Sequence, residues 1–232
     1  MKVSAIIAAA GRGRRMGGKQ NKQFLRLGND MILNLTLQQL DQIEEIKELI
    51  VVVGASEVKF CLEEIFAKGN FQTPYRVIAG GKERQDSVRA GLAVLSHTTD
   101  YVLIHDGARP LITKELIKNA LKTAKEKGTA VLAVPVKDTI KVVDQEGYVK
   151  STPERATLRA VQTPQIFRKD LICAAYEKAE QTGFYGTDDA SLVEAMGVPV
   201  FLVEGSYENI KITTPEDLLL AEEILRRRSK CG

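Results

Sequence analysis

Apolar positions follow two different spacings along the chain, and the two alternate. Five short runs are mainly apolar, which is typical of strands buried within a sheet. They cover residues 3–9, 49–53, 76–79, 101–104 and 129–134. Between them, apolar residues recur at helical spacing, in the ranges 33–40, 58–66 and 87–96 and after residue 113. This alternation predicts an α/β fold with a mostly parallel sheet and helices on both faces.

Signals for helix ends accompany this pattern. Thr113 is placed to cap a helix that Gly128 ends. The segment Thr214-Pro215-Glu216-Asp217 combines an N-cap residue, a proline at the first helical position and a capping-box acid. The sequence therefore predicts a last helix that starts near residue 215 and carries Leu218, Leu219, Ile224 and Leu225.

Residues 137–163 break the pattern. Ile140, Val142, Tyr148 and Val149 alternate around a turn at 145–147, and no helical period is present. We interpret the segment as a projecting β-arm. A hairpin with two unpaired edges is only marginally stable alone, so we expect the arm to pack against a second copy and form a homodimer.

The composition is that of one globular domain spanning residues 1–232, with 44% apolar and 27% charged residues. A net charge of +3 is too small for a nucleic-acid surface. The apolar runs are too short to cross a membrane, and no signal-peptide pattern follows Met1. We expect a cytoplasmic protein. Cys61, Cys173 and Cys231 are odd in number and widely spaced, so neither a disulfide framework nor a structural zinc site is indicated.

The first run ends in the segment A-A-A-G-R-G-R-R-M, residues 8–16, where an open parallel sheet places its ligand. Small residues let backbone N–H groups approach phosphate oxygens, and arginines add charge-assisted contacts. The five cations in residues 12–22 have no acidic residue among them: Arg12, Arg14, Arg15, Lys19 and Lys22. This arrangement predicts an anion site. A solvated basic loop is the alternative.

Two common phosphate motifs do not fit. The dinucleotide fingerprint needs a third glycine where Met16 stands. The P-loop pattern requires Ser or Thr where Gln20 stands, although Gly13, Gly18 and Lys19 have its spacing. The anion site is therefore of another kind.

The motifs in and after this loop resemble those of the 2-C-methyl-D-erythritol 4-phosphate cytidylyltransferases. The resemblance begins with A-A-G-x-G-x-R-M at residues 9–16 and K-Q-F at 22–24, and continues with G-G-x-x-R-x-x-S at 80–87 and H-D-x-A-R-P at 105–110. Later matching segments lie at 135–139, 162–165, 187–190 and 209–211. The resemblance covers nearly the whole chain and implies a Rossmann-like, nucleotide-diphospho-sugar transferase-like fold.

The resemblance also implies roles for particular residues. Arg15 and Lys22 would be catalytic, and Asp106 would bind Mg²⁺, the expected cofactor. The expected nucleotide-binding residues for CTP are Ala9, Ala10, Gly11, Gly13, Gly80, Gly81, Ser87 and Ala108. The expected residues for the alditol phosphate are Arg109, Thr139, Arg155, Thr163, Thr187 and Lys211. In the family the arm delivers its arginine from the neighbouring subunit, so each active site would be shared.

The chemistry expected for such an enzyme needs no general base. The attacking group is a phosphate monoester whose second pKa is about 6, so it is already largely deprotonated at pH 7. Positioning, a metal ion and cations suffice, and we expect His105 to be structural and His97 to be solvated. Asp106 could instead cap a turn, and Lys211 could be a plain surface charge.

Three other functions stay open at this stage. A ribitol-5-phosphate cytidylyltransferase would share the fold and the nucleotide. A sugar nucleotidyltransferase would use UTP or GTP. A noncatalytic nucleotide-sensing module would have no need of the cations at 15 and 22 or of the carboxylate at 106.

Overall fold

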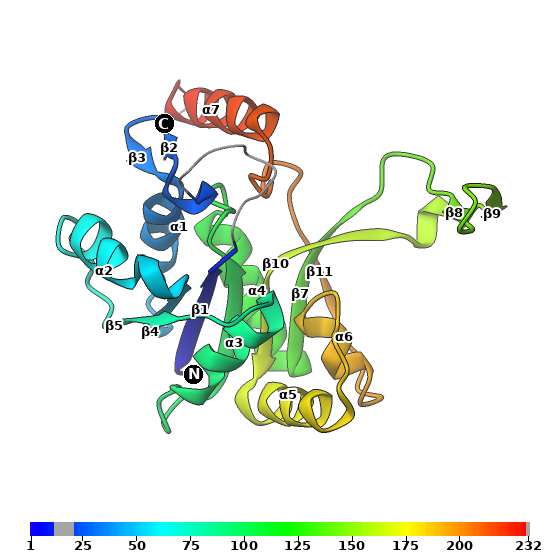
Figure 1. The fold of residues 1–232 in the computed structure, drawn as a ribbon, viewed down its shortest axis with the longest axis horizontal. Coiled ribbons are helices and arrows are strands. Elements are labelled where there is room, and N and C mark those ends of the chain that lie inside the picture. The colour runs from blue at the N-terminus through cyan, green and yellow to red at the C-terminus, as the bar shows by residue number, and fades with distance from the viewer. Residues whose placement is uncertain (12–20, 231–232) are drawn as a thin grey trace.

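A seven-stranded sheet forms the centre of the protein in a computed structural model that describes residues 1–11 and 21–230. The strand order is β11-β7-β10-β6-β1-β4-β5, and all neighbouring pairs are parallel except those of β10. The strands are β1 (Val3–Ala9), β4 (Ile46–Val53), β5 (Tyr75–Ala79), β6 (Tyr101–Asp106), β7 (Thr129–Pro135), β10 (Arg159–Arg168) and β11 (Leu202–Glu204). The α/β class predicted from the sequence is confirmed (Figure 1).

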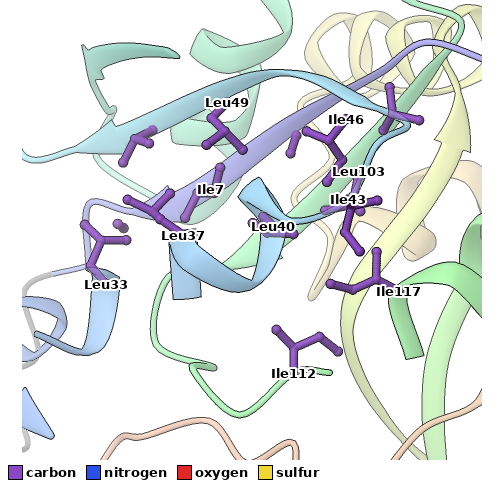
Figure 2. Packing of buried hydrophobic residues seen from close by; sticks show 14 of the residues in the cluster. Ile7, Leu33, Leu37, Leu40, Ile43, Ile46, Leu49, Leu103, Ile112 and Ile117 are labelled. Atoms are coloured by element: carbon purple, nitrogen blue, oxygen red, sulfur yellow. The ribbon is translucent and has the colours of Figure 1, made fainter. Parts of the chain in front are cut away.

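Helices cover both faces of this sheet. On one face, α1 (Ile32–Asp41) and α4 (Lys114–Lys127) pack their apolar sides into a large buried cluster, part of which Figure 2 shows around Ile7, Leu37 and Leu49. The other face is covered by α3 (Arg84–Ala93), α5 (Lys169–Thr182) and α6 (Asp189–Glu194). α7 (Pro215–Lys230) packs on a third, smaller cluster.

The alternation of side chains along each strand explains why both faces are apolar. Ala5 and Ile7 of β1 lie in the first cluster and Ile6 in the second. In β4, Leu49 and Ile50 divide in the same way. A strand buried on both faces has no polar side, which is why residues 5–9 of β1 and 49–53 of β4 are continuously apolar in the sequence.

Shorter elements connect the sheet and its helices. α2 (Val58–Cys61) continues as the π-helical turn η4 (Leu62–Phe66). The 3-10 turns are η2 (Lys22–Phe24), η3 (Ala55–Glu57) and η5 (Arg155–Thr157), and β2 (Arg26–Leu27) pairs with β3 (Asp30–Met31).

The predicted helix ends are confirmed. Thr113 Oγ1 accepts a hydrogen bond from the Leu116 N–H at 3.4 Å, and Gly128 ends α4. At the start of α7, the Asp217 carboxylate accepts from the Thr214 N–H at 2.9 Å. Leu219 of this helix is nevertheless 67% exposed, so it is not part of the core.

The sheet contains a strand that the apolar pattern did not indicate. β10 runs antiparallel between β6 and β7, so residues 159–163 belong to the central sheet although we had assigned them to the arm. Its buried residues include Gln162, Thr163 and Gln165. Apart from Ile166 and Phe167, these buried side chains are polar and give only a weak apolar signal, because their burial depends on hydrogen-bond partners elsewhere in the fold.

The rest of residues 137–163 projects from the sheet. Its two short strands, β8 (Val142–Val143) and β9 (Val149–Ser151), pair with each other and lie far from the body of the protein (Figure 1).

The parallel order places the carboxyl ends of β1, β4, β5 and β6 at one edge of the sheet. Chain connections leave β1 toward β4 and β5 on one side and return to β6 on its other side. In open α/β sheets, ligands bind at such a switch point. No helix within residues 1–11 and 21–230 is long and apolar enough to cross a membrane.

Candidate active site

A first cavity of about 600 Å³ opens at this edge of the sheet. That volume lies within the range of cavities that hold small molecules and cofactors. Of the expected nucleotide-binding residues that the structure describes, only Gly80 is missing from the lining. The lining residues are Ala8, Ala9, Ala10, Gly11, Lys22, Gln23, Gly81, Lys82, Glu83, Arg84, Ser87, Asp106, Ala108 and Lys211.

One wall of the first cavity is the turn between β5 and α3. The buried Ser87 hydroxyl accepts a hydrogen bond from the Gly81 N–H at 3.2 Å and donates to the Glu83 carbonyl at 3.1 Å. A Cβ added at Gly80 would lie 2.6 Å from the Ala10 Cβ, which is too close for any other residue without movement. The turn therefore packs directly on the end of β1, and Ser87 holds its shape.

Lys22 reaches the first cavity from η2, the turn that follows the predicted phosphate loop. The next residue, Gln23, is buried and donates a hydrogen bond from Nε2 to the Ala9 carbonyl at 2.6 Å. The turn that carries Lys22 is thus tied to the end of β1. Gly13 and Arg15 lie outside the described residues, so the joint action of Arg15 and Lys22 stays a prediction.

A second cavity of about 440 Å³ adjoins the first. Four of the six residues expected to bind the acceptor line it, and Arg84, Asp106 and Lys211 line both cavities. The lining residues are Arg84, Asp106, Arg109, Val161, Gln162, Thr163, Gln165, Thr187, Asp188, Ser191, Glu194 and Lys211.

Asp106, at the end of β6, is the buried carboxylate where the two cavities meet. Its Oδ2 lies 2.8 Å from Lys211 Nζ and 3.5 Å from Arg109 Nε, and its Oδ1 lies 3.2 Å from Arg84 Nε. Burial alone would raise the pKa of this carboxyl, but the positive charges of Arg84, Lys211 and Arg109 outweigh it and hold the pKa of Asp106 well below its usual range. The carboxylate is therefore ionised at neutral pH.

His105 has a structural role, as the sequence suggested. The Asp106 N–H donates to Thr163 Oγ1 at 3.0 Å, so the hydroxyl proton of Thr163 is available to His105 Nδ1, also at 3.0 Å. Nε2 then carries the imidazole proton and faces the Arg109 carbonyl at 3.3 Å. Burial lowers the pKa of His105 to about 4, so the ring is neutral. Thr163 thereby fixes the backbone of Asp106.

Two expected acceptor residues lie apart from both cavities. Thr139 and Arg155 are exposed on the arm, and Arg155 donates from Nη1 to the Lys137 carbonyl at 3.0 Å. One copy of the chain does not bring these side chains to its own Asp106. Arg109, Thr163, Thr187 and Lys211, by contrast, gather around the second cavity.

Sequence reasoning did not assign a role to Arg84, which the structure places at the centre of the site. Its guanidinium bridges two carboxylates, with Nε 3.2 Å from Asp106 and Nη2 2.7 Å from the fully buried Asp189. Asp189 also accepts a hydrogen bond from the Tyr176 hydroxyl at 2.6 Å. The arginine in the G-G-x-x-R-x-x-S segment was the available signal.

The fit of a magnesium ion can be tested on Asp106. Mg²⁺ usually takes one or two carboxylates and completes its shell with substrate phosphates and water. Across the described parts of the chain, no three His, Cys, Asp or Glu side chains gather closely enough to hold a metal by themselves. Asp106 supplies one carboxylate beside both cavities and so fits this mode of binding.

Comparison with known proteins gives a consistent result. The model of the 2-C-methyl-D-erythritol 4-phosphate cytidylyltransferase family matches residues 3–227. The chain belongs to this family. A relative of that name from Caldanaerobacter subterraneus is 49% identical over 98% of this chain and 100% of its own, and one from Clostridioides difficile is 49% identical over 98% and 95%.

Solved structures from the same family share the fold. The 4-diphosphocytidyl-2C-methyl-D-erythritol synthase of Anaerococcus prevotii is 35% identical, with a TM-score of 0.86 over 97% of this chain and 98% of its own. The 2-C-methyl-D-erythritol 4-phosphate cytidylyltransferase of Thermus thermophilus is also 35% identical, with a TM-score of 0.79 over 97% and 100%. The family resemblance and the enzyme class expected from the motifs, a nucleotidyltransferase, are confirmed. These comparisons favour the methylerythritol phosphate enzyme over the ribitol-5-phosphate alternative.

Proposed function

We propose that this chain transfers CMP from CTP to 2-C-methyl-D-erythritol 4-phosphate in the non-mevalonate isoprenoid pathway. The products are 4-diphosphocytidyl-2-C-methyl-D-erythritol and pyrophosphate. The observation that carries the proposal is the pair of adjoining cavities that share Arg84, Asp106 and Lys211. The first cavity has the small-residue lining and the cation of a nucleotide site, and the second is polar and suits a hydroxyl-bearing phosphate.

The reaction joins two phosphates where the cavities meet. An oxygen of the acceptor phosphate attacks the α-phosphorus of CTP, and the bond from that phosphorus to the oxygen bridging the β-phosphorus breaks. No proton has to leave the nucleophile, because a phosphate monoester with a second pKa of about 6 is already mostly dianionic at pH 7. Lys22, which lines the first cavity, stabilises the charge that grows as the phosphorus becomes five-coordinate. We assign the same role to Arg15.

Lys211 and Arg109 act on the acceptor side. Both flank the Asp106 carboxylate, which holds the two cations in place between the cavities. Because Asp106 is buried and ionised, it fixes these side chains without competition from water. Asp106 is also the residue that would hold Mg²⁺ together with triphosphate oxygens. The metal, when bound, would neutralise phosphate charge and orient the leaving pyrophosphate.

We propose that the arm completes the site of a second copy. Several of its apolar side chains are exposed to solvent: Tyr148 is 71%, Val149 58% and Val143 53% exposed. The short strands β8 and β9 would be marginal without a partner. A homodimer through the arms would cover these side chains and could carry Thr139 and Arg155 to the neighbouring second cavity.

The proposed substrates also set the location that we expect. CTP and a small sugar-alcohol phosphate are both charged, water-soluble molecules, so we propose a cytoplasmic enzyme. Neither substrate is a nucleic acid or a lipid. Fractionation of cells that express the tagged chain tests this location, and recovery in the membrane fraction would contradict it.

A coupled pyrophosphate assay tests the reaction. We expect release only when CTP, methylerythritol phosphate and Mg²⁺ are all present. UTP, GTP and ATP at equal concentration, and ribitol 5-phosphate as the acceptor, serve as comparisons. No turnover by folded protein would remove the proposal, and faster turnover with ribitol 5-phosphate would reassign the acceptor.

Mixing two inactive variants tests the shared site. In a dimer formed from Lys22→Ala and Arg155→Ala chains, one site has its own Lys22 and the partner's intact arginine. Random exchange in a two-fold dimer should therefore restore about a quarter of the wild-type activity. If Arg155 acts within its own chain, every mixed site lacks one residue and the mixture stays inactive.

A further inference from the structure

Glu57, in the turn between β4 and α2, contacts the chain on both sides of Lys22. Its carboxylate accepts hydrogen bonds from the Asn21 side-chain amide and, more weakly at 3.5 Å, from Gln23 Nε2. It also accepts from the Gly54 N–H at 3.0 Å, which fixes the carboxylate to the end of β4. A single half-buried acid thus joins the edge of the sheet to the residues before and after Lys22.

Other contacts also hold η2, and within the turn the Phe24 N–H donates to the Asn21 carbonyl at 3.0 Å. Gln23 is anchored to the Ala9 carbonyl at 2.6 Å, and the Phe24 ring meets the Phe60 ring edge-on with centroids 5.0 Å apart. Both contacts lie at or after Gln23. On the preceding side, Glu57 is the acceptor for the side chain of Asn21.

We propose that Glu57 is a positioning residue for Lys22. This inference rests on the proposed function, in which the Lys22 ammonium stabilises charge at the α-phosphorus. Glu57 lines neither cavity and so touches no substrate in them. It acts by holding the backbone that carries Lys22 at a fixed distance from the end of β1, where the nucleotide phosphates bind.

The chemistry of the carboxylate suits this role. Two oxygens with four lone-pair sites can accept from three donors at once, which an amide or hydroxyl in the same place cannot do. The carboxylate of Glu57 lies close to the backbone at Gly54: a Cβ added at Gly54 would lie 2.7 Å from Glu57 Oε2. A glycine at 54 therefore lets the carboxylate sit against the backbone of β4.

The expected effect falls on the chemical step. A displacement of about 1 Å in a group that acts on the reacting atoms can cost about a hundredfold in rate. Glu57→Gln keeps the size of the side chain but leaves one oxygen as acceptor, so we expect kcat to fall about 10- to 100-fold. The KM for the acceptor should stay within about twofold, because no residue lining the second cavity has a hydrogen bond to Glu57 within the described chain.

The matched control is Glu63→Gln. Glu63 lies in the following turn of the same helical segment and pairs with Lys59 at 3.8 Å, with both side chains mostly exposed. This variant removes the same charge without touching η2, and kcat should be unchanged. Gly54→Ala is a second perturbation. It keeps Glu57 in the chain but displaces its carboxylate, so it should lower kcat as Glu57→Gln does.

A double-variant cycle separates positioning of Lys22 from a general loss of structure. If Glu57 acts through Lys22, adding Glu57→Gln to Lys22→Ala should slow the reaction by no more than about twofold further. Independent roles would multiply the two losses and overturn the inference. A lowered melting temperature with normal kcat per folded molecule would assign Glu57 a purely structural role and also overturn it.

The same assay distinguishes failure of this inference from failure of the proposed function. If the wild-type enzyme does not release pyrophosphate from CTP and methylerythritol phosphate, the function is wrong. If the wild type turns over and Glu57→Gln matches it, the function stands and the positioning role is wrong.

Discussion

Replacing Arg84 with methionine should destabilise the fold as well as the site. The guanidinium contacts Asp189 at 2.7 Å and Asp106 at 3.2 Å, and the side chains of these two acids are 0% and 7% exposed. Methionine keeps the apolar stem of the side chain and removes the charge. In the variant, both buried carboxylates therefore lose the cation that they share.

The loss of the Arg84 charge affects the two acids unequally. Asp106 keeps Lys211 at 2.8 Å and Arg109 at 3.5 Å. Among the described residues, Asp189 keeps the Tyr176 hydroxyl at 2.6 Å, and it keeps its place in the first turn of α6, where the helix dipole favours negative charge. Breaking a buried pair by removing one partner costs about 3–5 kcal/mol. Because Asp189 retains some compensation, we expect about 3 kcal/mol for Arg84→Met.

Urea unfolding at pH 7 measures this loss. The control is Arg89→Met on the same helix, whose pairs with Asp86 and Glu180 are exposed and worth about 0–1 kcal/mol. Adding Asp189→Asn to Arg84→Met removes the uncompensated charge and should recover about 2 kcal/mol as coupling energy. Equal losses for the two arginine variants, or no recovery in the double variant, would refute the reasoning.

Three further predictions concern the pH dependence of stability, the turn at Gly80 beside the first cavity, and catalysis by Lys22. Burial lowers the pKa of His105 to about 4 from about 6.5 in the unfolded chain, so the unfolded state binds the extra proton between these values. The free energy of unfolding should then be constant above pH 6.5 and fall by about 3 kcal/mol toward pH 4, and a His105→Asn variant should lose this slope in urea titrations. Gly80→Ala should raise the KM for CTP about tenfold, measured by initial rates, because the new Cβ would meet Ala10 at 2.6 Å. Lys22→Ala should lower kcat by about a hundredfold or more with an unchanged circular dichroism spectrum, and near-normal turnover would contradict its catalytic role.

Much of the fold could be read from the sequence because strands buried on both faces are apolar over most of their length. β1 and β4 are of this kind, and their residues divide between the two core clusters. β10 could not be found in this way. Its Thr163 and Gln165 are buried only because Asp106, His105 and Asp188 provide hydrogen-bond partners from other parts of the chain.

In the candidate site too, some residues could be named from the sequence and others only from the structure. The motifs named Lys22, Asp106 and Lys211, and the structure brings all three to one cavity. The motif that contains Arg84 gave no reason to connect it with Asp189, since the two are 105 residues apart in the chain. Thr139 and Arg155 were expected from the family resemblance, and the sequence also placed them on the arm, but only the fold shows that they line neither cavity of their own chain.

The sequence by itself determined the α/β class and the family and predicted a phosphate-binding loop after the first strand, because periodicity and local motifs depend on residues close together in the chain. Only the tertiary structure decided which cations surround Asp106, that β10 lies within the sheet, and that Glu57 reaches both neighbours of Lys22. These features depend on which distant groups satisfy a buried charge or polar atom, and a local pattern carries no information about partners that the fold brings together.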